Sequence, residues 1–206
     1  PILAFLISIL VCYLINYVIN FFRLNLFQID YQMRICLILF GCLAAFALGS
    51  NLTASIVGIY SPYLDLNIKF HDLLFIISEE KLYFFGSLFI GIGALLFSQK
   101  IAQTVGSQIS KIKPVAALAI LITQIIILIS FSSQPIVEYL NFILPFNIFA
   151  IPLSASHITF ASIIGIASFN RFREVKPTHT IKIIMSWFLI PVSVFFTSYL
   201  FGMIKI

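Results

Sequence analysis

The sequence predicts an all-α membrane protein in which residues 1–206 form a single transmembrane domain, a polytopic helix bundle. Three observations support this fold class: 61% of the residues are hydrophobic, only 9% are charged, and the mean hydropathy is +1.12. A soluble domain carries about 25% charged residues. Because this chain has far fewer, it cannot cover a water-facing surface, and membrane lipid is an expected partner.

Six apolar stretches account for most of the chain. A membrane-spanning helix needs about 20 mainly apolar residues, because the hydrocarbon core is about 30 Å thick. The stretches that meet this requirement are Ile2–Phe22, Met33–Tyr60, Leu82–Ser98, Val115–Phe131, Ile136–Phe169 and Ile181–Ile204. We therefore predict about six crossings.

The connections between these stretches alternate in charge. Nine of the twelve lysines and arginines fall in the first, third and fifth connections, which are residues 23–34, 99–114 and 170–182. Because cytoplasmic loops are enriched in Lys and Arg, we predict that these three loops are cytoplasmic and that the membrane is the plasma (inner) membrane. The same bias explains the net charge of +5, so no nucleic-acid partner is expected.

Two of the predicted crossings contain interruptions rich in small polar residues, at residues 47–55 and 151–159. Broken backbone in hydrocarbon is tolerated only inside protein or beside a water-filled cavity. Ser, Thr and Asn are good N-caps, and a half-helix that starts at one of them points free N–H groups and the positive end of its dipole into the break. Such ends bind anions, and two interrupted helices near the midplane are typical of a transporter.

Other interpretations were weighed against this one. Small polar residues also occur at ordinary helix interfaces in membranes, and a single histidine such as His157 is often a hydrogen-bonded structural residue. Apart from their ends, the apolar stretches contain no carboxylate, lysine or arginine. The sequence has no nucleotide-binding phosphate loop, metal-ligand cluster or Ser-His-Asp set at membrane depth. We predict that the chain is not an enzyme and has no bound cofactor.

Short motifs lie at the two interruptions and between them. Residues 49–58 read Gly-Ser-Asn-Leu-Thr-Ala-Ser-Ile-Val-Gly, residues 103–106 read Gln-Thr-Val-Gly, and residues 152–157 read Pro-Leu-Ser-Ala-Ser-His. They resemble, in order, the Gly-Ala-Asn-Asp-Val-Ala-Asn-Ala-Ile-Gly, Glu-Thr-Val-Gly and Pro-Val-Ser-Thr-Thr-His motifs of the PiT family of inorganic phosphate transporters. The resemblance is to the C-terminal half of that family, and it spans nearly the whole chain.

The resemblance implies one half of an inverted-repeat transporter, here the second repeat, which holds an inorganic anion between the two halves. It also implies that the signature Asn and the hydroxyls of the second motif line the site. The substrate-binding residues carried over on this basis are Gly49, Asn51, Thr104, Ser154, Ser156 and His157. To these we add the neighbouring hydroxyls of the first interruption, which are Ser50, Thr53 and Ser55.

Three positions depart from the family motifs: Leu52 and Gln103 replace acids, and Ser55 replaces an Asn. Carboxylates are natural ligands of hard cations, so the loss of these two acids weakens the case for a Na⁺ site in this half. A buried carboxylate also accepts a hydrogen bond from hydrogen phosphate, whereas sulfate has no proton to offer at neutral pH. We hypothesise that Leu52 relaxes the selection between the two anions or favours sulfate.

The predicted function is secondary active transport of inorganic phosphate by alternating access, coupled to a co-transported cation, Na⁺ or H⁺. One alternative is a sulfate permease of the same fold. A second is a non-transporting membrane scaffold or degenerate repeat subunit. The expected partners are the phosphate or sulfate ion and either the other half of a longer transporter or a second copy in a homo-oligomer.

Overall fold

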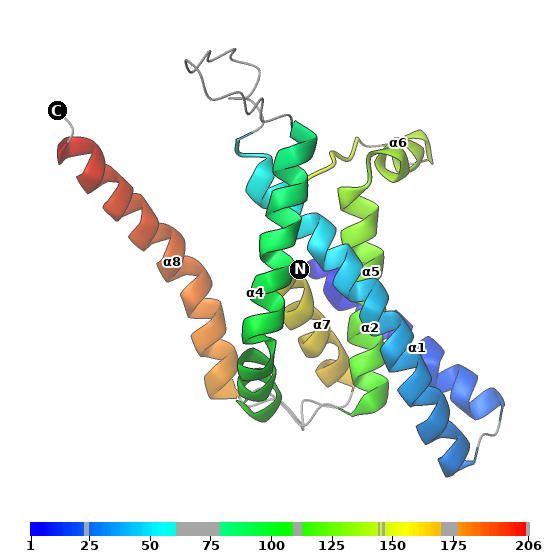
Figure 1. The fold of residues 1–206 in the computed structure, drawn as a ribbon. Coiled ribbons are helices and arrows are strands. Elements are labelled where there is room, and N and C mark those ends of the chain that lie inside the picture. Colours follow the sequence, from blue (N-terminus) through cyan, green and yellow to red (C-terminus); the bar gives the residue numbers. More distant parts are fainter. Residues whose placement is uncertain are drawn as a thin grey trace.

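The computed structural model of the chain describes residues 1–22, 25–60, 79–108, 113–143, 145, 147–169 and 177–204. Within these ranges the side chains of residues 26, 79, 100–108, 169, 177–179 and 203–204 are not described. All regular structure in the described part is helical, which confirms the all-α prediction. The helices are α1 (Ile2–Phe21), α2 (Leu26–Val57), α4 (Glu79–Gln108), α5 (Pro114–Ser132), α6 (Gln134–Ile143), α7 (Ala155–Phe169) and α8 (Pro177–Ile204) (Figure 1).

Five of these helices, α1, α2, α4, α5 and α8, contain a stretch long and apolar enough to cross a membrane. The fifth predicted crossing, 136–169, is divided into α6, a non-helical segment at 147–154, and α7. Its interruption is therefore confirmed, although helix resumes at Ala155, inside the predicted break of 151–159. At 1.5 Å per residue, α7 is only about 22 Å long, so it needs the segment before it to complete a crossing.

The interruption predicted at 47–55 is wrong, because α2 continues through it without a break. The polar side chains there bond to their own helix instead. The hydroxyl donors and carbonyl acceptors are Ser50 to Ala47 (3.0 Å), Thr53 to Gly49 (2.8 Å) and Ser55 to Asn51 (2.8 Å). Glycine costs a helix only about 1 kcal/mol relative to alanine, too little to end a helix that packs on both α4 and α5.

Three helices also extend into the predicted basic connections. α2 begins at Leu26, where the Asn25 backbone N–H donates to Gln28 Oε1 (3.1 Å) and so caps the helix start. α4 runs on to Gln108, and α8 begins at Pro177. The connections 23–34, 99–114 and 170–182 are therefore shorter than predicted, because polar residues at the membrane surface continue the helices into water.

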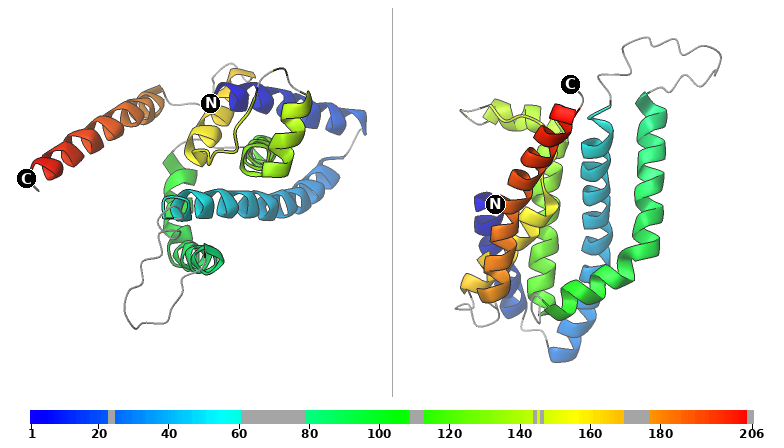
Figure 2. Two further views of the ribbon diagram at one scale, coloured as in Figure 1. Left: turned by 90° about the horizontal axis from the view of Figure 1, so that it is seen from above. Right: turned by 90° about the vertical axis from the view of Figure 1, so that its left-hand side faces the viewer.

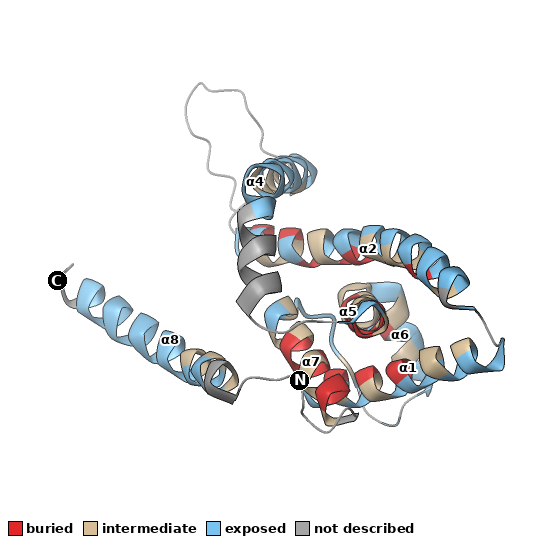
Figure 3. Cartoon of the chain, turned by 90° about the horizontal axis from the view of Figure 1, so that it is seen from below, coloured by how far each residue is buried: buried red, intermediate tan, exposed pale blue. Residues whose placement is uncertain are grey.

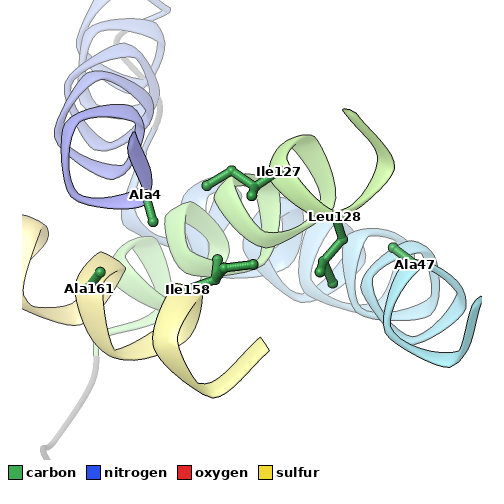
Figure 4. Close-up of a cluster of buried hydrophobic side chains, with 6 residues drawn as sticks. All are labelled: Ala4, Ala47, Ile127, Leu128, Ile158 and Ala161. Carbon is green, nitrogen blue, oxygen red and sulfur yellow. The ribbon is translucent and has the colours of Figure 1, made fainter. Parts of the chain in front are cut away.

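Helix α5 lies at the centre of the bundle and packs against α1, α2, α6 and α7, while α4 packs on the outer side of α2. Figures 1 and 2 show α8 leaning away from the other helices. Buried residues gather where α1, α5 and α7 meet, and α4 and α8 are mainly exposed (Figure 3). One core cluster joins four helices and consists of Ala4, Ala47, Ile127, Leu128, Ile158 and Ala161 (Figure 4).

Helices α1 and α7 approach each other most closely at Gly165. A Cβ atom added there would lie 2.6 Å from the Phe5 carbonyl oxygen and would also collide with the Ser8 hydroxyl. Ser8 itself is fully buried and donates to the same carbonyl (2.8 Å). Small residues that let backbones approach in this way are the usual means of packing helices in membranes.

The ends of the helices sort onto two sides of the bundle. The facing ends of α1 and α2, of α4 and α5, and of α7 and α8 all lie at the lower side in Figure 1, and α6 lies at the opposite side. The described helix ends that border the three predicted basic connections therefore share one end of the molecule.

Candidate functional site

Helix α7 begins part-way through the bundle rather than at its surface (Figure 2, right). Pro152 lacks an N–H and disfavours helical backbone at the residue before it, which keeps the preceding segment extended. The Ser154 carbonyl then accepts the first helical bond, from the Ile158 N–H (3.2 Å), so Ser154 is the N-cap. The first N–H groups of a helix have no partner within it, and those of α7 are thus presented inside the bundle.

Two hydroxyl groups lie at this helix start. Ser154 Oγ and Ser156 Oγ are 3.0 Å apart, and both side chains are exposed. Each hydroxyl can donate one hydrogen bond to an oxyanion. Together with the N–H groups and the positive end of the helix dipole, they form a site suited to a small anion, with no cationic side chain required.

A cavity of about 220 Å³ adjoins the start of α7. Its polar side chains are Ser154 and His157, and the rest of its lining is mainly apolar. The lining residues are Pro1, Leu3, Ala4, Ile127, Phe131, Leu153, Ser154, His157 and Ile158. A water molecule occupies about 30 Å³ in the liquid, so the space admits a tetrahedral oxyanion with a few waters.

His157 also connects this site to α8. Its ring meets that of Trp187 edge to face, with the centroids 4.0 Å apart and the planes at 83°. Phe160, one turn further along α7, meets the same indole at 5.1 Å. Edge-to-face pairs add about 0.5–1.5 kcal/mol beyond area burial, so Trp187 fixes the ring of His157 beside the cavity.

Asn51 reaches the site from α2 and is only 1% exposed. Its Nδ2 donates to the Leu153 carbonyl (2.7 Å), and its Oδ1 accepts from the Leu153 N–H (2.8 Å). The Ser132 hydroxyl donates to the same Oδ1 at 3.4 Å. The structure thus joins the first motif to the second, but through the backbone of the residue before Ser154. Asn51 itself does not line the cavity.

The other predicted site residues lie apart from the cavity. Gly49, Ser50, Thr53 and Ser55 are on α2, and none of them lines it. Leu52, also on α2, is 37% exposed and is not in the lining either. Thr104 belongs to α4, but its side chain lies outside the described part of the structure. A substrate-binding role for each of these residues stays a prediction.

Asn141 is a residue near the site that the sequence did not single out. Its amide makes two hydrogen bonds to the backbone of Ile148, at the start of the non-helical segment. The only available signal was an asparagine four residues before Pro145, inside the apolar stretch 136–169. Among the described residues, no group of three His, Cys, Asp or Glu side chains could hold a metal ion.

Comparison with known proteins gives one match. Residues 25–198 match the model of the phosphate transporter family, a range that holds all three motif segments and extends from the start of α2 into α8. No curated protein and no solved structure matches the chain.

Proposed function

The chain belongs to the phosphate transporter family, and we propose that it carries inorganic phosphate across the membrane, coupled to a cation, by binding the anion at the start of α7. One observation carries this proposal: a helix begins inside the bundle with two serine hydroxyls 3.0 Å apart and a cavity beside them. This geometry concentrates hydrogen-bond donors in one place, and the substrate of the family, phosphate, is an oxyanion.

Binding uses donors from the first turn of α7. The unpaired N–H groups, the Ser154 and Ser156 hydroxyls and the His157 ring face an anion that enters the cavity. Hydrogen bonds to a charged group are stronger than those between neutral groups, at about 1.5–3 kcal/mol each. No lysine or arginine lines the cavity, so a co-transported Na⁺ or H⁺ offsets the charge of the anion during the crossing.

Sulfate is the second candidate substrate. The cavity lining contains donors but no carboxylate, and a carboxylate acceptor is the group that would distinguish hydrogen phosphate from sulfate. A site without a carboxylate can bind both tetrahedral oxyanions. The scaffold alternative predicts that neither anion is transported.

Transport follows alternating access, in which groups of helices rock to expose the anion to one side or the other. We place the end of the bundle that carries the basic connections in the cytoplasm, in the plasma (inner) membrane, because of the excess of Lys and Arg there. The other half of the transporter, or a second copy of the chain, covers the side on which α8 stands away from α7.

The test is uptake of labelled phosphate and labelled sulfate by the complete protein in proteoliposomes, under imposed Na⁺ or H⁺ gradients. We expect Ser154→Ala/Ser156→Ala to raise the KM about tenfold or more, because two donors to a charged group are removed. Ser193→Ala is the matched control, since that exposed hydroxyl on α8 donates only to its own helix, at the Ile190 carbonyl (2.8 Å).

The gradient that drives saturable uptake identifies the coupling ion. An unchanged KM in the double variant, from protein that transports normally, would remove Ser154 and Ser156 from the binding site. No uptake of either anion by well-folded protein, under any gradient, would favour the scaffold.

A further inference from the structure

Two asparagine side chains hold the non-helical segment 147–154 in the same way. Asn141 Nδ2 donates to the Ile148 carbonyl (2.8 Å), and the Ile148 N–H donates to Asn141 Oδ1 (2.6 Å). Asn51 makes the equivalent pair with Leu153, at 2.7 and 2.8 Å. Each amide therefore bonds to both polar groups of one residue, as the opposite residue does in a hydrogen-bonded pair of an antiparallel sheet. We call these two contacts the asparagine clamps.

The chemistry of the clamps requires a primary amide. The amide of Asn or Gln carries an uncharged donor and an uncharged acceptor side by side in one plane, whereas an ionised carboxylate offers no donor. Extended backbone at membrane depth must find partners for its polar groups inside the protein. Between the two clamps the Ile151 N–H donates to the Phe131 carbonyl at the end of α5 (3.1 Å). The segment is thus fixed at three points between residues 148 and 153.

The two clamps differ in how far apart in the sequence the bonded residues lie. Asn141 is seven residues from Ile148 and ties the segment to α6, the helix from which it emerges. Asn51 is 102 residues from Leu153 and ties the segment to α2. Leu153 directly precedes Ser154, the N-cap of α7. The Asn51 clamp therefore sets where the serine hydroxyls and the free N–H groups of α7 lie relative to α2.

We propose that Asn51 and Asn141 are positioning residues of the anion site: their clamps hold the segment 147–154 so that the donors at the start of α7 face the cavity. Neither side chain lines the cavity, and each amide already bonds to backbone through its nitrogen and its oxygen, so we do not assign anion binding to either. The transport consequence rests on the proposed function, whereas the structural consequence is measurable without transport.

The structural test is backbone hydrogen exchange of the peptide covering residues 147–154, in the complete protein in lipid nanodiscs. We expect Asn141→Leu and Asn51→Leu each to speed this exchange about tenfold or more, because both hydrogen bonds of a clamp are lost. Asn141→Asp keeps the acceptor for the Ile148 N–H but loses the donor to the Ile148 carbonyl, and it is expected to restore only part of the protection. The matched control is Asn16→Leu, since the Asn16 amide donates only within its own helix, to the Cys12 carbonyl (2.8 Å) and thiol.

The functional test is the kinetics of uptake by the same proteins. We expect Asn141→Leu to raise the KM several-fold with little change in Vmax, although Asn141 does not line the cavity. Asn16→Leu is expected to change neither. A residue important only for folding would lower the amount of active protein, and so Vmax, instead.

Two results would overturn the proposal: exchange of residues 147–154 that is the same in Asn141→Leu as in the parent, or faster exchange with an unchanged KM. If Asn51→Leu does not fold, Asn141→Leu still tests the proposal. Its clamp lies at the more exposed end of the segment, so we expect this variant to fold. If the parent transports neither anion, the proposed function fails, and the exchange result alone decides whether the clamps exist.

Discussion

Hydroxyl side chains have two different roles in this protein, and serine occurs in both. Thr123 in α5 and Ser162 in α7 are fully buried and donate to carbonyls of their own helices (2.8 Å each). Ser154 and Ser156 stand at the start of a helix, where their hydroxyls bond to each other (3.0 Å) and Ser154 lines the cavity. A hydroxyl inside a helix finds its acceptor one turn back, whereas a hydroxyl at a helix start stays available for a ligand.

We hypothesise that Leu52 affects the selection between phosphate and sulfate, although it does not line the cavity. We expect Leu52→Asp to raise the ratio of phosphate to sulfate uptake about tenfold, because a carboxylate accepts a hydrogen bond from hydrogen phosphate and repels sulfate. The measurement is competitive uptake of the two labelled anions in proteoliposomes. Leu43→Asp, at an exposed leucine on the same helix, controls for placing an acid in α2. Equal ratios in the two variants would show that Leu52 plays no part in selection.

At the scale of the element, α7 is placed by its start and by its contact with α1. Pro152 and Ser154 determine where the helix begins, and the clamps place that start within the bundle. Gly165 then lets α7 approach the α1 backbone until no Cβ fits between them. A half-length helix held at both its start and its middle has little freedom to shift its donors away from the cavity.

We expect Gly165→Ala to lower the free energy of unfolding by about 1–3 kcal/mol, because the added methyl group forces α1 and α7 apart. Gly93→Ala is the control, since nothing lies within 4 Å of a Cβ at that glycine in α4. Alanine favours a helix by about 1 kcal/mol over glycine, so this control should be neutral or stabilising. The measurement is thermal unfolding in detergent, and equal melting temperatures for the two variants would contradict the close packing.

At the scale of the whole molecule, the arrangement of the helix ends agrees with the distribution of basic residues along the sequence. The described helix ends next to the three connections that hold nine of the twelve basic residues lie at one end, and α6 lies at the other. The ion pair between Arg34 and Asp30 (2.9 Å) is exposed and links positions four apart on α2. Exposed pairs of this kind contribute about 0.3–0.5 kcal/mol to the stability of the fold. We therefore expect the charged residues of this chain to matter more for its orientation in the membrane than for its stability.

This arrangement predicts the sidedness of the protein. With Cys12, Cys36 and Cys42 replaced by Ala, we expect an impermeant maleimide to label Tyr139→Cys in intact right-side-out cells. Lys113→Cys should react only after the membrane is permeabilised, because we propose, from the excess of Lys and Arg there, that its end of the bundle lies in the cytoplasm. Labelling of Lys113→Cys in intact cells would reverse the orientation.

The sequence by itself determined the fold class, the positions of most crossings, the alternation of the connections and the interruption after Pro152. These features follow from local composition, since hydropathy, charge and proline act through neighbouring residues. The same local reasoning failed at residues 47–55, where each hydroxyl found an acceptor inside a continuous helix.

Only the tertiary structure decided what the two asparagines do. Asn51 meets a backbone 102 residues away, and Asn141 became significant only when the segment after α6 proved to be extended. A side-chain amide has the same donor and acceptor wherever it stands, so its partner depends on which backbone is left without one. That is fixed by how α2, α5, α6 and α7 pack together, and no pattern along the chain encodes it.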